Sequence, residues 1–404
     1  MDGANILISL KMLNLDICLS FADIGHNIRD SFKKGRMKIG YIVHDLNDPS
    51  VERRCIMLER GGAEVVLTGF YRGDKVKSVV AGRNPLVLGR TKDAAMLSRL
   101  TSTLKHVFSV GKLKAHFMDC DVILARNLEQ LAIAMRLKVS RHLTYECLDL
   151  HRLLLGTGFV PRMIQSVESK LLSKVDGLLT SSPAFLRNHF DDSTLNAPQY
   201  LIENKFLVET VSECLPPSAA TSSVIRIGWF GMLRCRKTFK VLRELAERSD
   251  GRVEVIISGR PSVAELPELP EVAKASKGVT YTGPYTYSDL PELYGQCHFA
   301  WAIDWFEEGL NSEWLLPNRL YESISHGAVP IVLAKTEMGR WLEARGAGLR
   351  IMPGTDPCEM ILGLKPSDIA GFQAEIQAVP VGDVMADDTD CERLVKFISR
   401  AEII

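Results

Sequence analysis

The chain has 404 residues, of which 46% are hydrophobic and 24% are charged, a mixture that excludes a disordered, collagen-like or low-complexity protein. Its length suits two domains of roughly 200 residues each. The formal net charge is zero, but residues 1–200 carry 28 Lys/Arg against 20 Asp/Glu, whereas residues 201–404 carry 21 against 29. This asymmetry predicts an anionic partner for the first half, such as a nucleic acid, a membrane surface or a pyrophosphate-linked substrate.

The nine cysteines include no C-x-x-C pair and no metal-site spacing with histidine, so we expect buried free thiols and no metal centre. Residues 4–22 are apolar, but Lys11 and Asp16 interrupt the run and no cleavage site follows. We therefore expect neither a membrane-spanning helix nor a signal peptide. Because Met37 directly precedes a strand-like segment, residues 1–36 are interpreted as an N-terminal appendage.

From Met37 onward, short apolar runs alternate with stretches of helical period. In the first half, strands are predicted at 38–43, 63–70, 121–127, 142–149 and 175–182, and helices at 51–62, 128–138 and 161–174. After a Pro- and Ser-containing stretch the alternation restarts. In the second half, strands are predicted at 224–231, 253–259, 279–283, 298–304 and 328–334, and helices at 236–249, 289–297 and 318–327.

Apolar strands that alternate with helices are typical of a parallel sheet covered on both faces. The order strand–helix–strand–helix–strand occurs twice, which predicts an α/β chain with two doubly wound, Rossmann-like domains facing one cleft. The predicted domains are 37–206 and 224–404, with a linker at 207–223. Ligands of such sheets bind beyond the carboxyl ends of the strands, so the loops there are expected to carry the chemistry.

The strongest motif is WLLPNRLYESISHGAVP at residues 314–330, which follows a loop at 309–312. A helix that begins after a loop offers free N–H groups and a positive dipole end to a phosphate or a sugar hydroxyl. Glu322, one to two turns into this helix, could accept hydrogen bonds from two vicinal hydroxyls, as a nucleotide ribose presents them. The alternative is an ordinary solvated helix residue.

The segment PNRLYESISHGAVPIV resembles the donor-site helix of GT-B glycosyltransferases of the glycosyltransferase family 4 type, often written P-N-K-L-x-E-x-x-x-x-G-x-P. The resemblance implies the GT-B fold, with residues 37–206 as the acceptor-binding domain and residues 224–404 as the nucleotide-sugar-binding domain. It also implies that Glu322 holds the ribose of a nucleotide sugar, with Asn318 and Arg319 at the start of the donor-binding helix.

The loop before this helix is implicated by the same resemblance. Three of its residues are expected to approach the donor sugar and its phosphates: Gly309, Asn311 and Ser312. Many family members carry a further glutamate eight positions before the one that Glu322 matches, and Trp314 stands at that position here.

Two further segments resemble the donor site of the family. In IGWFGMLRCRKTFKVLREL, Lys237 falls on the lysine that clamps the donor diphosphate, and Arg234 or Arg236 would supply the second charge. Basic residues at a helix N-terminus oppose the dipole, so a bound anion explains them better than stability does, although a wet surface is the alternative. In VTYTGPYTY, Tyr285 lies in the loop that cradles the nucleobase and could stack on it; plain packing is as common.

The first half places a histidine and an aspartate after two strands, in HDLNDP at 44–49 and ECLDLHR at 146–152. His44, Asp45, Asp149 and His151 are therefore candidates for acceptor binding or catalytic proton transfer. Histidines with a purely structural role are the alternative. Together with WFGMLRCRK and NSEWLLPNRLYE, the extended match over about residues 37–400 resembles the succinoglycan-type exopolysaccharide glycosyltransferases.

The resemblance implies a hexosyltransferase that moves a sugar, by default glucose from UDP-glucose, to a growing lipid-linked oligosaccharide in exopolysaccharide biosynthesis. No cofactor and no metal are expected, because the cleft loops carry no D-x-D pair and the basic loop can neutralise a diphosphate. The alternatives are a nucleotide-sugar epimerase of the same fold and a non-catalytic sugar-nucleotide-binding protein. The missing G-x-G-x-x-G disfavours a dinucleotide enzyme, and the missing base-stacking motif disfavours nucleic acid.

Residues 71–117 carry ten Lys/Arg against two acidic residues, and the part at 94–117 has helical apolar spacing. The stretch could simply cover the first sheet. A basic surface beside the acceptor cleft would, however, hold the protein at an anionic membrane. We therefore expect a cytoplasmic protein bound peripherally to the inner face of the cell membrane, without a spanning helix.

Overall fold

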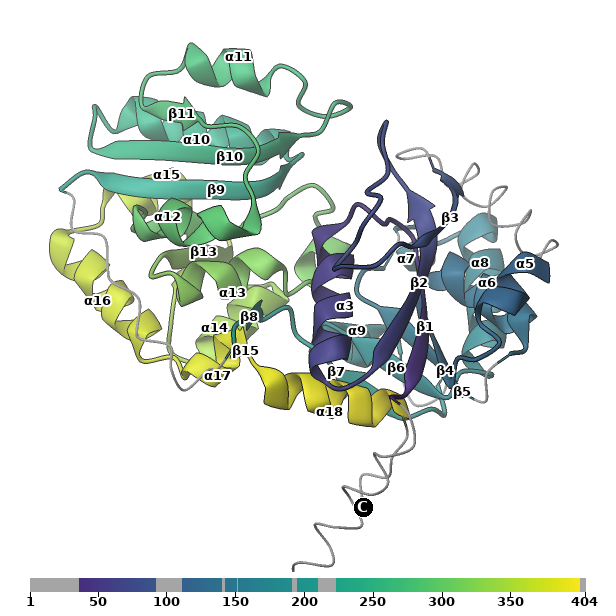
Figure 1. The fold of residues 1–404 in the computed structure, drawn as a ribbon. Coiled ribbons are helices and arrows are strands. Elements are labelled where there is room, and N and C mark those ends of the chain that lie inside the picture. The colour runs from purple at the N-terminus through teal and green to yellow at the C-terminus, as the bar shows by residue number, and fades with distance from the viewer. Residues whose placement is uncertain are drawn as a thin grey trace, which may run out of the picture. The chain divides into compact units, whose positions relative to one another are not determined.

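Each half of the chain folds around its own parallel β-sheet, as the ribbon in Figure 1 shows. The structure is a computed structural model, and it describes residues 36–91, 111–139, 142–150, 152–190, 195–209 and 223–399. The predicted appendage and most of the linker therefore lie outside the described residues.

The first sheet has seven parallel strands in the order β3-β2-β1-β4-β5-β6-β7. Its strands are β1 (Lys38–Val43), β2 (Glu64–Tyr71), β3 (Leu86–Arg90), β4 (Val122–Arg126), β5 (His142–Cys147), β6 (Gly177–Thr180) and β7 (Gln199–Leu201). The central strands are mostly apolar because both faces are covered, and every residue of β4 is buried. The strand order reverses between β1 and β4, which is where doubly wound sheets bind ligands.

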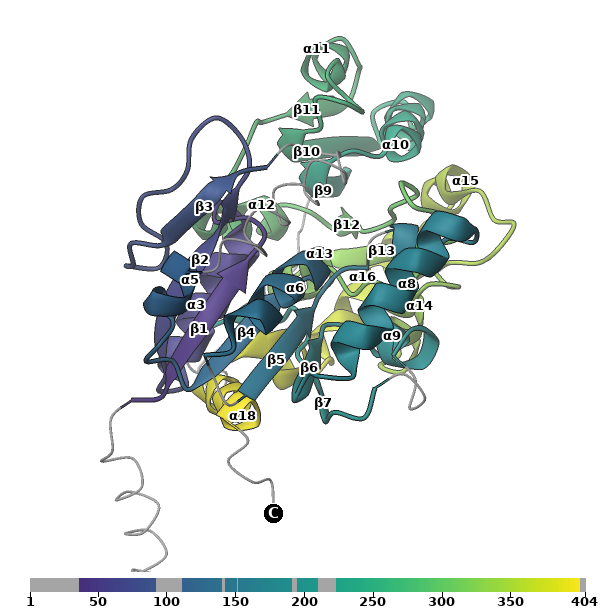
Figure 2. The ribbon, with the colours of Figure 1, turned by 90° about the vertical axis from the view of Figure 1, so that its right-hand side faces the viewer.

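Six helices of the first half accompany its sheet within the described residues. They are α3 (Pro49–Arg60), α5 (Gly111–His116), α6 (Leu128–Leu137), α7 (Arg152–Leu155), α8 (Phe159–Leu172) and α9 (Pro183–Asn188). Helix α3 begins where it does because the side chain of Asp48 accepts a hydrogen bond from the backbone N of Ser50, and Pro49 suits the first turn. Helix α3 lies on one face of the sheet, and α6 and α8 lie side by side on the other (Figure 2).

The second sheet has six parallel strands in the order β11-β10-β9-β12-β13-β14. Its strands are β9 (Ile225–Leu233), β10 (Val253–Pro261), β11 (Val279–Tyr281), β12 (Phe299–Trp301), β13 (Val329–Leu333) and β14 (Leu349–Ile351). The accompanying helices are α10 (Arg236–Arg248), α11 (Leu269–Lys274), η2 (Tyr287–Asp289), α12 (Leu290–Gly295), η3 (Asn311–Glu313), α13 (Asn318–Ser325), α14 (Glu337–Glu343), α15 (Pro357–Leu362) and α16 (Pro366–Gln377).

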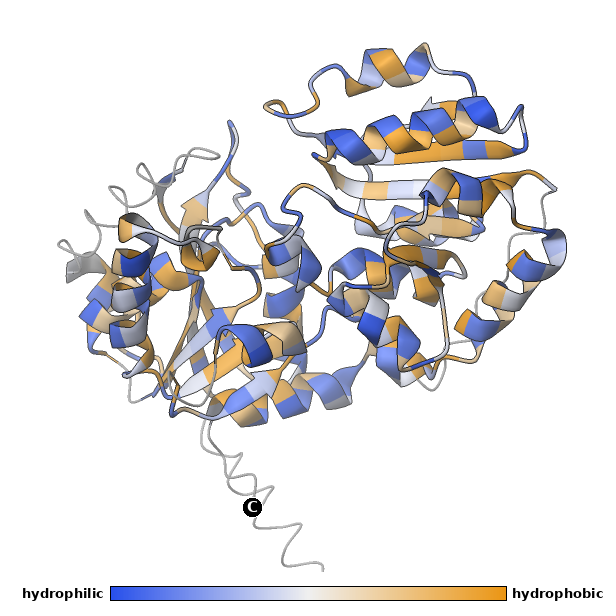
Figure 3. Cartoon of the chain, turned by 180° about the vertical axis from the view of Figure 1, so that it is seen from behind, coloured by the Kyte–Doolittle hydropathy of each residue, from blue (hydrophilic) through white to orange (hydrophobic). Residues whose placement is uncertain are grey.

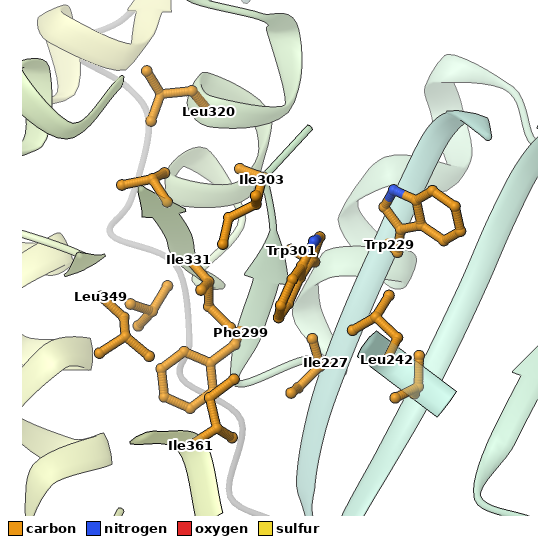
Figure 4. Packing of buried hydrophobic residues seen from close by; sticks show 14 of the residues in the cluster. Ile227, Trp229, Leu242, Phe299, Trp301, Ile303, Leu320, Ile331, Leu349 and Ile361 are labelled. Carbon is orange, nitrogen blue, oxygen red and sulfur yellow. The ribbon is translucent and has the colours of Figure 1, made fainter. Parts of the chain in front are cut away.

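Successive side chains of β9 point to opposite faces of the second sheet, and the apolar ones pack into two separate cores, one on each face. Ile227 and Trp229 join a large cluster with Phe299, Trp301 and residues from the neighbouring strands and helices (Figure 4). Phe230, the next residue, points into the smaller cluster on the opposite face. This two-residue period is the reason a parallel strand covered on both sides reads as a continuous apolar run. Figure 3 shows the same apolar bias in the strands of both sheets.

The end of the chain returns to the first sheet. After α17 (Val381–Val384), strand β15 (Met385–Ala386) pairs in parallel with β8 (Phe206–Leu207), and helix α18 (Asp388–Ser399) packs against α3 (Figure 1). Gly61 makes this approach possible, because a Cβ there would lie 2.3 Å from the backbone oxygen of Cys391. The residues predicted as part of the second domain thus include a helix that covers the first sheet.

Candidate functional site

A cavity of about 450 Å³ lies beyond the carboxyl ends of strands from both sheets. Its wall combines the loops after β1, β2, β4 and β5 of the first sheet with the end of β9, the loop before η2 and the start of α13. This is the position predicted from the strand order of both halves. Six of the predicted site residues line the cavity: His44, Asp149, Tyr285, Asn318, Arg319 and Glu322.

Glu322 lies in the cavity wall on α13 and is only 7% exposed. The hydroxyl of Tyr294 donates to its Oε2 at 3.5 Å. Burial raises the pKa of Glu322, and the nearby charges of Arg53 and Arg319 oppose this shift by favouring the carboxylate. A buried carboxylate at this depth cannot be the solvated helix residue that the sequence left as an alternative.

Arg53, on α3 of the first half, reaches the start of α13. Its Nη2 donates to Oδ1 of Asn318 at 3.2 Å and to Oδ1 of Asn204 at 2.9 Å. The side-chain nitrogen of Asn204 in turn donates to the backbone oxygen of Leu316 at 3.0 Å. These contacts tie the first turn of α13 to the first half of the chain. Arg53 was not among the predicted site residues, since it lies inside a helix rather than after a strand.

Gly231 opens the wall between Arg319 and Tyr285. Its φ is +113°, a backbone conformation that favours glycine, and a Cβ would lie 4.0 Å from both the Arg319 Nη2 and the Tyr285 hydroxyl. Tyr285 packs edge-to-face on Phe230 at 6.4 Å between ring centroids. Burial raises the pKa of the Tyr285 hydroxyl, so it stays neutral and offers its ring and O–H to a ligand.

The predicted basic loop after β9 does not line the cavity. Each of its charged residues pairs with a carboxylate: Arg234 with Asp304 at 3.4 Å, Arg236 with Glu268 at 2.6 Å and Lys237 with Glu308 at 3.2 Å. These pairs are partly exposed, and exposed pairs of this kind stabilise a protein by only about 0–1 kcal/mol. An incoming anion can therefore exchange with the carboxylates at little cost.

The loop at 309–312 closes against the first half of the chain. The side-chain nitrogen of Asn311, a residue that is 2% exposed, donates a hydrogen bond to Oδ1 of Asp149. Ser312 is also buried, and its hydroxyl accepts from the backbone N of Glu307 at 3.2 Å. Gly309, with a φ of +79°, turns the chain before them. Asn311 and Ser312 thus shape the loop behind the cavity, and Asn311 orients Asp149.

Asp149 follows β5 and lines the cavity. Burial raises the pKa of its carboxyl group, while the Asn311 hydrogen bond and the charge of Arg234 lower it by a smaller amount. A carboxylate with a raised pKa, held by a donor from the opposite wall, has the properties of a general base.

His44 lies at the end of β1 beside Asp48, with Nε2 at 3.7 Å from Oδ2. Arg126, at the end of β4, contributes its Nη1 to the same group, 2.9 Å from the Ser50 hydroxyl and 3.9 Å from Asp48 Oδ2. Burial alone would raise the pKa of Asp48, but Arg126 and His44 outweigh it and the net shift is downward. Arg126 was not predicted, although it ends a strand as His44 does.

The buried carboxylate of Glu146 binds the guanidinium group of Arg126. Its Nε donates to Glu146 Oε2 at 2.8 Å, and Nε of Arg54 donates to the other oxygen, Oε1, at 2.6 Å. The Tyr41 hydroxyl also donates to Oε2, at 2.5 Å. Burial would raise the pKa of Glu146, but Arg126 and Arg54 lower it to about 2. This network sets the position of the first-sheet wall of the cavity.

Two further predicted catalytic candidates, Asp45 and His151, are not among the cavity-lining residues described above. The Asp45 carboxylate accepts from the backbone N of Asn47 at 3.0 Å and of Arg72 at 3.1 Å, so it joins the loops after β1 and β2. Asp45 does not line the cavity. His151 lies outside the described residues.

Trp314, which stands where the family often has a glutamate, packs against the core of the first half. Its backbone oxygen accepts a hydrogen bond from the Ser182 hydroxyl at 2.5 Å. The position therefore contributes an apolar anchor between the two halves instead of an acid. In the described part of the chain, no group of three His, Cys, Asp or Glu side chains is arranged to hold a metal ion.

No protein-family model matches the chain. The succinoglycan biosynthesis protein ExoL of Rhizobium meliloti is 40% identical to it over 377 residues, which cover 90% of this chain and 93% of ExoL. Among solved structures, sucrose-phosphate synthase of Thermosynechococcus elongatus matches 91% of the chain and 99% of its own, with a TM-score of 0.66 and 13% identity. The Anabaena protein HepE, solved with UDP and glucose, matches 89% of the chain and 98% of its own, with a TM-score of 0.61 and 14% identity.

The lipopolysaccharide glycosyltransferase WaaG is similar in the same way, with a TM-score of 0.59, 12% identity and coverage of 90% of this chain and 100% of its own. These likenesses confirm the predicted fold, in which two doubly wound sheets face one cleft.

Proposed function

The chain belongs to the family of the succinoglycan biosynthesis protein ExoL, the glycosyltransferases of exopolysaccharide biosynthesis, and on this premise we propose its donor, acceptor and site residues. The donor is a UDP-hexose, by default UDP-glucose, and the acceptor is a lipid-linked oligosaccharide. The observation that carries the proposal is the buried carboxylate of Glu322 in the cavity wall, one turn into α13 and beside Arg319.

Glu322 accepts hydrogen bonds from the ribose hydroxyls of the nucleotide. Such bonds to a charged acceptor are the strong ones, and Arg53 and Arg319 favour the ionised form that they require. Tyr285 offers its ring to the base from the same wall. The UDP and glucose bound to HepE, a protein of similar fold, support uridine as the base and glucose as the default sugar.

The diphosphate of the donor lies between the start of α13 and the basic loop after β9. Arg319 contributes its charge from the cavity wall. Lys237 and Arg234 exchange their carboxylate partners, Glu308 and Asp304, for phosphate oxygens as the donor binds. Arg236 is the further basic residue of this loop. These cations neutralise the leaving diphosphate, so the reaction needs neither a metal nor another cofactor.

In the transfer step, a hydroxyl oxygen of the acceptor forms the new bond to the anomeric carbon, and the bond from that carbon to the diphosphate oxygen breaks. UDP leaves with the electron pair of that bond. The hydroxyl proton passes to the carboxylate of Asp149. Burial raises the pKa of this group, and the hydrogen bond from Asn311 fixes its orientation. His44 binds the acceptor from the end of β1, which β4 separates from β5 in the sheet, and His151 is the remaining candidate for proton transfer.

A lipid-linked acceptor would be reached at a membrane surface. Among the described residues, no helix has both the length and the apolar character to cross a bilayer. We propose that the protein works in the cytoplasm and binds the inner face of the cell membrane peripherally, through contacts with anionic lipids that salt weakens.

Two measurements test the function directly. Titration calorimetry with UDP and with GDP should show binding of UDP, and UDP-glucose should release UDP faster in the presence of a short-chain lipid-pyrophosphate oligosaccharide. Binding of neither nucleotide at millimolar concentration would exclude the donor site. UDP release without a glycosylated product would point to an epimerase or a hydrolase instead.

A further inference from the structure

Helix α8 presents an apolar stripe on its outer face. Phe159, Met163 and Val167 are 78%, 54% and 51% exposed, and they follow one another at intervals of four residues. Residues four apart lie on the same face of a helix, so these three form one stripe. Single exposed apolar residues are ordinary on a protein surface, but an aligned series on one helix marks an interaction surface.

The same face carries positive charge. Arg162, Lys170 and Lys174 are all exposed. At about 100° per residue, Arg162 and Lys170 lie, together with the apolar stripe, within about 140° of the helix circumference, and Lys174 follows two residues after the end of α8. The acidic residue of α8, Glu168, lies on the opposite side, where it is 4% exposed and its Oε2 is 2.9 Å from Nε2 of His189.

The opposite side of α8 already supplies the packing that the fold needs. Leu172 is buried in the core of the first half, and Ile164 and Leu171 pack against that core. The outer stripe is therefore not required to hold the helix in place. A helix with apolar and cationic side chains together on its free face has the composition of one that lies in the interface of an anionic bilayer.

Helix α8 is also joined to the wall of the cavity. The side-chain nitrogen of Gln165 donates to the backbone oxygen of Leu154 at 2.7 Å, and Leu154 lines the cavity from α7. Phe159 begins α8 five residues after Leu154. A membrane bound to this face would thus lie next to the acceptor side of the site.

We propose that the outer face of α8, formed by Phe159, Arg162, Met163, Val167 and Lys170, together with Lys174 just after the helix, is the surface that binds the protein to an anionic membrane. The apolar side chains enter the level of the lipid headgroups, and the three cations contact lipid phosphates. The inference rests on the proposed membrane-bound acceptor and adds the docking surface, which lies on a helix other than the basic segment identified from the sequence.

Flotation with vesicles tests this surface. The full chain should float with phosphatidylglycerol vesicles at low salt and stay behind with phosphatidylcholine vesicles. A basic residue near an anionic surface contributes about fivefold in binding, so the double change Arg162→Gln and Lys170→Gln should weaken it about 25-fold. The double change Phe159→Ser and Met163→Ser should weaken it at least about tenfold.

Matched controls lie on the second half of the chain. Val263 is 87% exposed and the Lys277 side chain 78%, so Val263→Ser and Lys277→Gln should leave vesicle binding unchanged. Wild-type binding by all α8 variants, or no binding of the wild type to phosphatidylglycerol, would overturn the proposal. So would a sedimentation experiment in which the stripe changes split a dimer without altering vesicle binding.

Transfer to a short, water-soluble acceptor separates this proposal from the proposed function. The α8 variants should keep wild-type activity with that acceptor and lose activity only when the acceptor is carried on vesicles. Loss of vesicle binding together with intact soluble transfer supports the docking surface. Absence of any transfer by the wild type would contradict the proposed function, while its vesicle binding would still test the surface.

Discussion

Asn311, in the loop before α13, donates its side-chain N–H to Oδ1 of Asp149, which follows β5 in the first half of the chain. Both residues belong to loops at the carboxyl ends of strands, one from each sheet. The hydrogen bond fixes the orientation of the Asp149 carboxylate at the cavity and leaves its second oxygen available for a proton. Burial raises the pKa of this carboxyl group.

Replacing this carboxylate tests the proposed role of Asp149 as the base. Asp149→Asn should lower kcat by about 10²–10⁴-fold, because an amide cannot accept the hydroxyl proton, and should leave the Kd for UDP unchanged. In the wild type, kcat should fall as the pH falls through the raised pKa of Asp149. Asp74→Asn, a change at a side chain that is 94% exposed, is the matched control. Full activity of the Asp149→Asn enzyme would remove this residue from catalysis.

Glu322→Ala should weaken UDP binding by about 1.5–3 kcal/mol, since hydrogen bonds from the ribose to a charged acceptor would be lost. Titration calorimetry measures the effect, and Glu292→Ala on the exposed face of α12 serves as the control. An unchanged Kd for UDP in the Glu322→Ala protein would show that the ribose binds elsewhere.

Lys237→Ala distinguishes a diphosphate contact from a surface ion pair. If the Lys237 ammonium exchanges Glu308 for phosphate, the variant should bind UDP about tenfold more weakly, as expected for a charged hydrogen bond, and should bind uridine as the wild type does. Lys240→Ala, one turn further along α10, provides the comparison. Equal losses for UDP and uridine would indicate a general distortion of the loop.

Activity should persist in EDTA and should not rise when Mg²⁺ is restored. The physical reason is that, in the proposed site, Arg319 and the basic loop would supply the positive charge for the leaving diphosphate. The UDP-release assay measures both conditions in the same sample. A loss in EDTA that Mg²⁺ reverses would contradict the proposed neutralisation by side chains.

The buried network behind Arg126 should make stability depend on acid pH. Arg126 and Arg54 lower the pKa of Glu146 from its ordinary value of 4.5 to about 2. The unfolded chain therefore binds the proton first as the pH falls, so this stabilisation is fully present above pH 4.5 and is lost as the pH approaches 2. Urea unfolding at a series of pH values in this range measures the slope.

Glu146→Gln tests the same network at neutral pH. The change leaves two buried guanidinium groups without their carboxylate and should cost about 3–5 kcal/mol of unfolding free energy. Glu64→Gln, at a side chain that is 51% exposed, should cost less than about 1 kcal/mol. Equal stabilities of these two variants would show that the network does not hold the cavity wall.

The sequence by itself determined the alternation of strands and helices, because strands covered on both faces are apolar along most of their length. It also identified α13 and Glu322, since the P-N-R-L-x-E motif is local and its residues fall on one helix. The edge strand β3, the short strands β7, β8, β14 and β15 and the helices from residue 337 onward were not predicted. Strands of two or three residues are defined by their partners in the sheet, which a local pattern does not contain.

Tertiary structure alone decided which charged residues meet. Arg53 and Asn318 lie 265 residues apart and bond across the two halves, and Asn311 reaches Asp149 over 162 residues. Side chains that come from different sheets share no spacing in the sequence, so no periodicity could pair them. The same holds for the carboxylates that pair with Lys237 and its neighbours. It also holds for the exposed stripe on α8, because only the packing decides which surfaces are covered and which stay open.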